Sequence, residues 1–284
     1  MKARYFMEKT PIFRGVGTAM ITPFKKDGKI DFESLKRLTE IQLCAGVDAL
    51  IVCGTTGECA TLTREERFEI TRSVTAEAGD DCKVICGTGC NDTQKAITYT
   101  KDAVQAGADG ILAVTPYYNK TNQKGLVKYY KTICESTSKS VIAYNVPSRT
   151  GVNIMPETAF EISALPNAAG LKEASGNMAQ ITETSALCGE ALPIYSGSDE
   201  INISVFAIGG IGMISVVSNA VPKKMKELWN RWQSGDTKGA ARLQGELFPL
   251  IKSMFSDINP IPIKKYLYEK GLTEFVLRPP LYAE

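Results

Sequence analysis

Lys172 lies in the run AAGLKEASG and is the residue of this sequence best placed for covalent chemistry. The run predicts a strand on which Lys172 shares one face with Gly170 and Ala174, so that small neighbours leave room for its amine. A lysine held in an apolar site acts as a nucleophile toward carbonyl carbons and forms Schiff bases. The same side chain could instead extend to solvent or pair with a carboxylate, and its position alone leaves these alternatives open.

The sequence contains no histidine, and this excludes several kinds of catalysis. Ser-His-Asp and Cys-His catalysis, a HExxH zinc site and a histidine base are all ruled out. Tyr144, in SVIAYNVPSRTG, ends the predicted strand before that of Lys172, where its phenol could exchange protons. Arg149 follows in the next loop, and its planar guanidinium suits a carboxylate. Taken singly, these residues could be a core tyrosine and a surface arginine.

Two further stretches offer groups that could bind a small anion or line an interface. The glycines of CGTTGEC (53–59) let the backbone approach a ligand, and the amides of Thr55 and Thr56 would suit an anion. In TPYYNK, the paired aromatic residues Tyr117 and Tyr118 follow a predicted strand and are typical of a lid or an interface.

Eight short apolar runs, about 20 to 35 residues apart, predict the strands that must position these residues. They are 16–22, 49–53, 84–87, 111–115, 141–145, 168–174, 194–197 and 212–217. The stretches between them have helical character, with N-caps such as Asp31 and Thr63. Apolar strands that alternate with helices predict a parallel sheet, and eight repeats favour an α/β fold of the (β/α)₈ TIM barrel type.

The alternative is a doubly wound open sheet, but no GxGxxG turn follows the first run. We expect the barrel, with a short N-terminal extension, to occupy 1–225. A C-terminal helical appendage would occupy 226–284.

Composition excludes several partners and cofactors. The net charge is +2, and no basic run with interleaved aromatic residues predicts a nucleic-acid partner. The apolar runs are too short to span a membrane and the N-terminus lacks an apolar signal, so a cytoplasmic location is expected. The eight cysteines include no CxxC, and Cys82, Cys86 and Cys90 lack a fourth ligand. We therefore expect neither disulfides nor a metal.

Five motifs taken together resemble the dihydrodipicolinate synthase family of pyruvate-dependent aldolases. They are GTTGE (54–58), TPYYNK (115–120), YNVPSRTG (144–151), LKEASG (171–176) and YSGSD (195–199). The resemblance implies that pyruvate condenses with L-aspartate 4-semialdehyde to give 4-hydroxy-tetrahydrodipicolinate, in diaminopimelate and lysine biosynthesis. The lysine Schiff base would serve in place of a cofactor. Arg149 favours this family over sibling lyases and aldolases that act on keto-sugar acids. Such a sibling, or a non-catalytic keto-acid binder, remains the alternative.

The resemblance assigns the chemistry to four residues. Lys172 matches the lysine that forms the Schiff base, and Tyr144 matches the tyrosine that transfers protons. Thr55 matches the hydroxyl that links Tyr144 to a second tyrosine, here Tyr118, which in the family comes from the neighbouring subunit. A homo-oligomer is therefore implied, and the family is usually a tetramer built as a dimer of tight dimers.

The resemblance also assigns the substrate-binding positions and an effector cleft. Thr56 matches the pyruvate carboxylate binder, and Arg149 matches the arginine that receives the semialdehyde carboxylate. Gly197 and Ile214 match backbone positions that line the pyruvate pocket. The effector-cleft positions are Cys59, Arg64, Arg67, Asn91, Lys95 and Tyr117.

Lysine-inhibited members carry histidines and a glutamate in the effector cleft. This chain has Arg64, Arg67 and Lys95 at the corresponding positions, and Cys59 where a serine is usual. Because three positive charges would repel a cationic effector, we predict weak or absent feedback inhibition by lysine.

Overall fold

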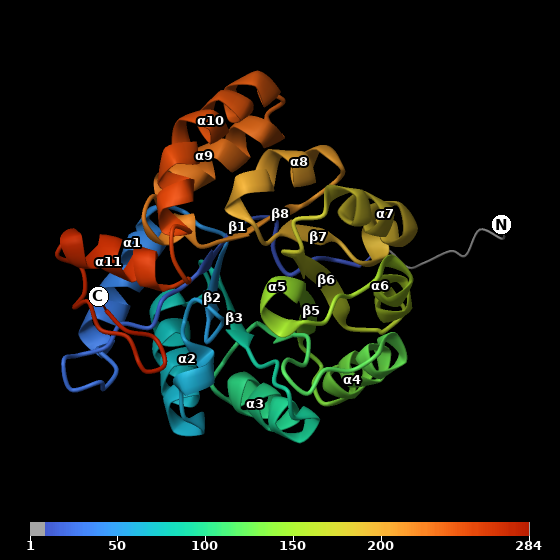
Figure 1. The fold of residues 1–284 in the computed structure, drawn as a ribbon, viewed down its shortest axis with the longest axis horizontal. Coiled ribbons are helices and arrows are strands. Elements are labelled where there is room, and N and C mark those ends of the chain that lie inside the picture. Colours follow the sequence, from blue (N-terminus) through green and yellow to red (C-terminus); the bar gives the residue numbers. More distant parts are fainter. Residues whose placement is uncertain (1–8, 284) are drawn as a thin grey trace.

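A closed barrel of eight parallel strands forms the centre of the molecule (Figure 1). The computed structural model describes residues 9–283, so most of the expected N-terminal extension lies outside the described residues. The strands are β1 (Gly15–Ala19), β2 (Ala49–Val52), β3 (Lys83–Gly87), β4 (Gly110–Val114), β5 (Ser140–Asn145), β6 (Ala168–Glu173), β7 (Ile194–Ser196) and β8 (Gly212–Ser215). All eight predicted strands are confirmed.

The pairing of β1 with β8 closes the sheet. Its register runs from Gly15 opposite Gly212 to Thr18 opposite Ser215. The open-sheet alternative is therefore wrong, because both edges of such a sheet are used in this pairing. The (β/α)₈ barrel follows, and residues at the carboxyl ends of the strands meet at one end of the molecule.

Helices surround the barrel and connect its strands. They are α1 (Phe32–Cys44), α2 (Arg64–Ala78), α3 (Thr93–Gln105), α4 (Gln123–Glu135), α5 (Pro147–Thr150), α6 (Pro156–Ser163), α7 (Met178–Cys188), α8 (Asn202–Ala207), α9 (Pro222–Gln233), α10 (Thr237–Met254) and α11 (Ile261–Glu269). The Asp31 side chain caps α1 by accepting from the Ser34 amide. Thr63 and Glu66 form a capping box at the start of α2. No helix within residues 9–283 is long and apolar enough to cross a membrane.

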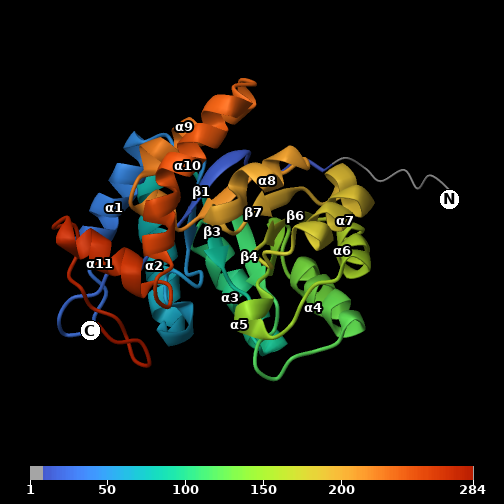
Figure 2. The same ribbon diagram turned by 45° about the horizontal axis from the view of Figure 1, so that its top comes forward.

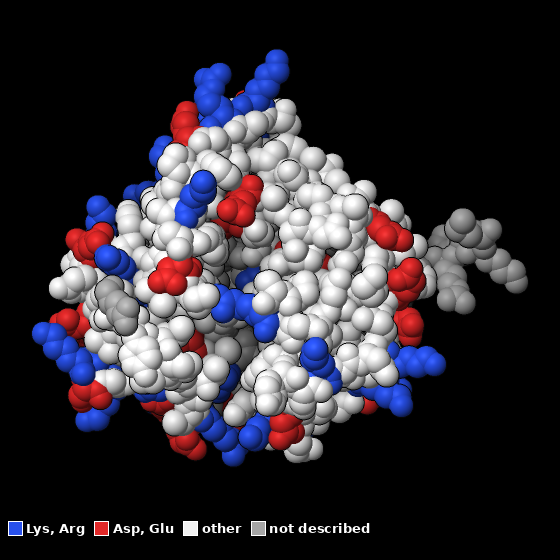
Figure 3. Space-filling view, viewed as in Figure 1, with Lys and Arg blue, Asp and Glu red and all other residues white. Residues whose placement is uncertain are grey.

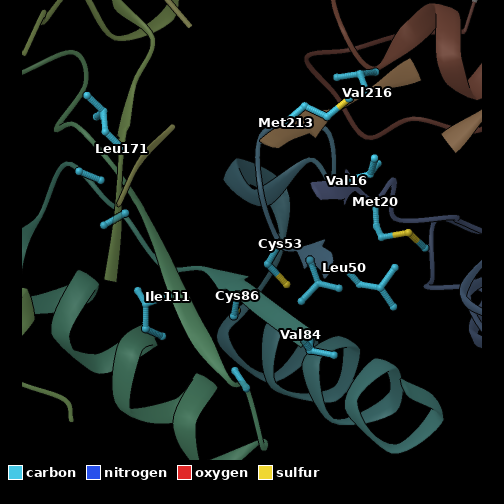
Figure 4. Close-up of a cluster of buried hydrophobic side chains, with 14 of the residues drawn as sticks. Val16, Met20, Leu50, Cys53, Val84, Cys86, Ile111, Leu171, Met213 and Val216 are labelled. Carbon is cyan, nitrogen blue, oxygen red and sulfur yellow. The ribbon is translucent and has the colours of Figure 1, made fainter. Parts of the chain in front are cut away.

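Two apolar layers hold the barrel together. Inside it, residues such as Ile51, Ile142, Tyr144 and Ile214 form one buried cluster, called here the interior cluster. Between the strands and the helices lies a second cluster, part of which Figure 4 shows. Because these two layers cover both faces of the sheet with apolar side chains, a polar binding site is expected at the carboxyl ends of the strands.

The C-terminal helices lie against one side of the barrel, and α9 and α10 run side by side in both ribbon views (Figures 1 and 2). Helix α9 continues without a break across the division expected between 225 and 226. Met225 and Leu228 are both buried in the second cluster, between the strands and the helices. Lys226 forms an ion pair with Asp48, its Nζ lying 2.5 Å from Oδ2, and so ties α9 to the loop before β2.

Candidate active site

Lys172 and Tyr144 lie side by side at the carboxyl ends of β6 and β5. They are register partners in these paired strands. Lys172 is 5% exposed, and its Nζ lies 4.3 Å from the centroid of the Tyr144 ring, which is also buried. Glu173, the next residue of β6, is bonded elsewhere: its Oε2 accepts from Asn145 Nδ2 at 3.0 Å. The Lys172 amine and the Tyr144 ring are therefore in contact, while the Glu173 carboxylate is hydrogen-bonded to Asn145.

Gly197 directly follows β7 and borders the lysine, while Ile214 lies in β8. A Cβ at Gly197 would lie 3.0 Å from Lys172 Cγ and 2.9 Å from Ala174 Cβ, so the glycine backbone packs directly on the lysine stem. Ile214 is 1% exposed and belongs to the interior cluster. Of the two predicted positions, Gly197 is therefore in direct contact with Lys172, and Ile214 faces the barrel interior.

Replacing Gly197 with alanine should displace Lys172. The added methyl group has no room beside Lys172 Cγ, and a misplacement of about 1 Å can cost roughly 10²-fold in rate. We expect a loss of that order in kcat, measured with saturating substrates. Gly245→Ala in α10 is the control, because a Cβ there meets nothing within 4 Å. Equal kcat values for the two variants would contradict this prediction.

A pocket of about 260 Å³ opens beyond the carboxyl ends of β2, β4 and β5, and neither Lys172 nor Tyr144 lines it. Its lining residues are Thr55, Glu58, Cys59, Ala60, Thr61, Val114, Tyr117, Val146, Arg149, Thr150, Ile258, Asn259, Pro260, Pro280 and Leu281. Val146 lines it and also packs in the interior cluster with Tyr144, so the pocket adjoins the buried pair. Figure 3 shows a hollow at the centre of this face, with both basic and acidic side chains around it.

Thr55, Thr56 and Arg149 meet around this pocket. Thr55 lines it, Thr56 is 3% exposed, and Arg149 lies in the short helix α5. Arg149 Nη2 donates to the backbone oxygen of Asn259 at 3.1 Å. Asn259 Nδ2 donates to Thr56 Oγ1, also at 3.1 Å. Asn259 therefore connects two predicted binding residues and was missed by the sequence analysis. An Asn-Pro pair indicates a turn, but nothing in it indicates a place at the barrel mouth.

The two tyrosines of TPYYNK lie in different surroundings. Tyr117 lines the pocket, and burial raises the pKa of its phenol to about 12, with Cys90 and Cys59 nearby. Tyr118 is 90% exposed and has a φ of 69°, a left-handed conformation that is uncommon for a bulky residue. Within residues 9–283, Tyr118 is not among the residues that line the pocket of its own chain.

A buried ion pair holds the GTTGE turn against the C-terminal tail. Lys264 Nζ contacts Glu58 Oε1, and both side chains are almost fully buried. The Arg278 amide donates to Glu58 Oε2 at 3.0 Å. Burial lowers the pKa of Lys264 to about 8, although Glu58 acts in the opposite direction. The segment that contributes Arg278 goes on to line the pocket with Pro280 and Leu281, so the tail fixes the turn and closes one wall.

The cationic residues of the expected effector cleft have different surroundings. Arg67 is 9% exposed, and its Nη1 donates to the Gly87 oxygen at 3.1 Å. Arg64 extends from the same helix and pairs with Asp102 at 2.5 Å. Of the three positive charges, Arg64 is therefore paired with a carboxylate, and Arg67 is buried with backbone oxygens as partners. The physical reason is that Arg67 lies on the face of α2 that packs inward with Ile70.

The other effector-cleft positions are only partly near this arginine, which contacts the Cys59 backbone oxygen. Cys59 and Tyr117 line the pocket, while the backbone oxygen of Asn91 accepts from Asn119 Nδ2 at 2.9 Å. Lys95 is exposed on α3. All eight cysteines are free, and residues 9–283 contain no group of three or more Cys, Asp or Glu side chains that could hold a metal.

The barrel and the position of its pocket place this chain in the class of (β/α)₈-barrel enzymes, whose active sites lie at the carboxyl ends of the strands. Within that class, a model of the dihydrodipicolinate synthetase family matches residues 12–283, and the chain belongs to this family.

Relatives and solved structures agree with this membership. The 4-hydroxy-tetrahydrodipicolinate synthase of Caldicellulosiruptor saccharolyticus is 46% identical over 92% of this chain and 88% of its own. The crystal structure of dihydrodipicolinate synthase from Thermotoga maritima is 44% identical, with a TM-score of 0.94 over 96% of this chain and 94% of that one. A structure described as a monomeric dihydrodipicolinate synthase variant is 45% identical, with a TM-score of 0.94 over 96% and 92%.

Proposed function

We propose that this chain condenses pyruvate with L-aspartate 4-semialdehyde to give 4-hydroxy-tetrahydrodipicolinate, in diaminopimelate and lysine biosynthesis. The observation that carries the proposal is the buried Lys172 amine against the Tyr144 ring, next to a pocket lined by Arg149. Family membership and the names of the relatives support the same reaction. The eight free cysteines fit a reducing compartment, which supports a cytoplasmic location.

The reaction would start with covalent capture of pyruvate on Lys172. The neutral amine attacks the keto carbon, water leaves, and an iminium forms as the electron sink. A proton leaves the methyl carbon to give an enamine, and this carbon attacks the aldehyde carbon of the second substrate. The C=O π bond breaks, its oxygen takes a proton to become the hydroxyl, and the iminium re-forms. The amine of that substrate then attacks the iminium carbon, releases Lys172 and closes the ring. No cofactor is needed in this sequence.

Proton transfer in this scheme would use hydroxyl groups in place of histidine. Tyr144 lies within reach of Lys172, and Thr55 lines the adjoining pocket. Thr56, with the backbone of Gly197 and Ile214, would hold pyruvate, and Arg149 would receive the semialdehyde carboxylate. The buried position of Thr56 and the pocket position of Arg149 suit a deeper first substrate and an outer second one.

Two measurements test this function. Borohydride reduction with pyruvate, followed by peptide mass mapping, should label Lys172, and failure to label it would end the Schiff-base scheme. A coupled assay with aspartate semialdehyde should then show turnover. Labelling without turnover, together with cleavage of a keto-sugar acid, would favour a sibling aldolase. Labelling without either activity would favour a keto-acid binder.

Tyr118 is proposed to act in the site of a neighbouring subunit, in a homo-oligomer that we infer to be a tetramer of two tight dimers. Its 90% exposure and left-handed backbone support a contact outside its own chain. We expect Tyr118→Phe and Lys172→Arg each to be inactive, and their mixture to recover about a quarter of wild-type activity. The recovery follows because each mixed dimer contains one site with both native residues. No recovery after subunit exchange, verified by mass spectrometry, would place Tyr118 in its own site.

We predict that L-lysine inhibits the enzyme weakly or not at all. The buried Arg67 guanidinium contacts the Cys59 backbone oxygen, beside the pocket wall that Tyr117 and Cys59 share, and it disfavours a cationic effector there. A titration of activity with L-lysine checks this prediction. Half-inhibition below about 1 mM, a binding free energy near −4 kcal/mol, would contradict it.

A further inference from the structure

Asn259 lies between α10 and α11 and forms part of the pocket wall. It is 8% exposed, and its polar groups face two elements that are far away in sequence. Its backbone oxygen accepts from Arg149 Nη2, and its Nδ2 donates to Thr56 Oγ1. One residue of the C-terminal appendage therefore contacts both side chains that are proposed to bind carboxylates.

The bond from Asn259 orients the Thr56 hydroxyl. A threonine hydroxyl has one proton to donate and can accept through its lone pairs. Because Oγ1 accepts from Asn259 Nδ2, its own proton stays available for another acceptor. In the proposed function that acceptor is the pyruvate carboxylate, so Asn259 acts as a positioning residue for the first substrate.

Asn259 Oδ1 differs from Nδ2 in its hydrogen bonding. It is buried and has no hydrogen-bond partner within the described part of the chain. Most buried polar atoms are paired, so an unpaired acceptor in a pocket wall indicates that a ligand supplies the donor. Asn202 Oδ1 is also unpaired, but Asn202 is not among the residues that line this pocket.

The chemistry of the second substrate supplies a matching donor. An α-amino acid carries its carboxylate and its ammonium group on the same carbon. With the carboxylate on Arg149, the ammonium would lie close to the residue that Arg149 already contacts, namely Asn259. An ammonium group has three donors and no acceptor, so it complements the free carbonyl oxygen.

We propose that Asn259 determines specificity for the amino group of the aldehyde substrate: Oδ1 accepts a hydrogen bond from the substrate ammonium while Nδ2 orients Thr56. This inference rests on the function proposed above. It assigns a recognition role to the C-terminal appendage, which also holds the GTTGE turn and closes one wall of the pocket.

The test compares aspartate semialdehyde with succinate semialdehyde, which lacks only the amino group. The measured quantity is the affinity ratio of the two aldehydes at saturating pyruvate, from KM for the first and competitive inhibition by the second. Any general disturbance of the site affects both aldehydes and cancels in the ratio. We expect Asn259→Ala to reduce the wild-type preference for the amino compound by roughly ten- to a hundredfold.

One further variant separates the two contacts of Asn259, and a second serves as a control. Asn259→Asp keeps an acceptor oxygen but loses the donor to Thr56, so the aldehyde ratio should persist while KM for pyruvate rises. This variant also serves if Asn259→Ala does not fold. Asn202→Ala removes the other unpaired asparagine oxygen and should leave the aldehyde ratio unchanged.

The outcomes distinguish this inference from the function on which it rests. If borohydride with pyruvate labels Lys172 in the wild type and in Asn259→Ala, and the aldehyde ratio is the same in both, Asn259 does not recognise the amino group. A lost preference in Asn259→Asp overturns the inference in the same way. Failure to label the wild type would instead overturn the proposed function.

Discussion

A Lys172→Arg variant is expected to fold normally and to lose both its covalent adduct with pyruvate and its activity. Arginine keeps the positive charge and a long stem, but its guanidinium stays protonated and does not form a Schiff base. Lys172 is 5% exposed and lies beside Tyr144, so an amine elsewhere in the described chain could not take over its position. We expect kcat to fall by on the order of 10³-fold or more.

The measurement combines a coupled assay, borohydride labelling and thermal unfolding. Lys226→Arg is the control, since Lys226 is also partly buried but pairs with Asp48 away from the pocket. It should keep the label on Lys172 and most of the activity. A Lys172→Arg protein that retains turnover with pyruvate would rule out covalent capture at this position.

The sequence predicted the barrel and the central pair for a physical reason. Buried parallel strands are nearly all apolar, and each of the eight runs has polar stretches on both sides. Successive βα units place their strands side by side, so Tyr144 and Lys172, at the ends of consecutive strands, had to become neighbours. Local sequence and fold topology together were sufficient for this part of the site.

The remaining contacts join segments without a local signal. Asn259 and Thr56 lie 203 residues apart, and Lys264 lies 206 residues from Glu58. The sequence IPIKKYLYEK does not show which of its lysines is buried. Arg67 is a different case, because its spacing from Ile70 and Val74 is that of the buried face of α2. That periodicity could have shown that its charge points inward.

Removing the charge of Lys264 should destabilise the fold more than most single substitutions. In a Lys264→Met variant, the buried Glu58 carboxylate would lose its ammonium partner and keep only the Arg278 amide. Breaking a buried ion pair from one side costs about 3–5 kcal/mol, because the remaining charge is uncompensated. We expect a loss of that size in the free energy of unfolding, measured by urea titration at pH 7.

The neighbouring residue gives a matched control. Lys265 lies in the same helix but is exposed, so Lys265→Met should change the free energy of unfolding by less than about 0.5 kcal/mol. If Lys264→Met were as stable as this control, the ion pair would not be what fixes the tail to the GTTGE turn.

A double variant separates the lost partner from the lost packing. Glu58→Gln combined with Lys264→Met leaves no buried charge, while methionine still fills the space beside the Phe24 ring, which lies 4.2 Å from Lys264 Nζ. Because the main penalty in the single variant is the unpaired carboxylate, the double variant should regain at least about 1 kcal/mol. Activity should recover less, since Glu58 also anchors the turn that presents Thr55 and Thr56. Full recovery of stability without recovery of kcat would show that this ion pair serves the geometry of the site rather than the stability of the barrel.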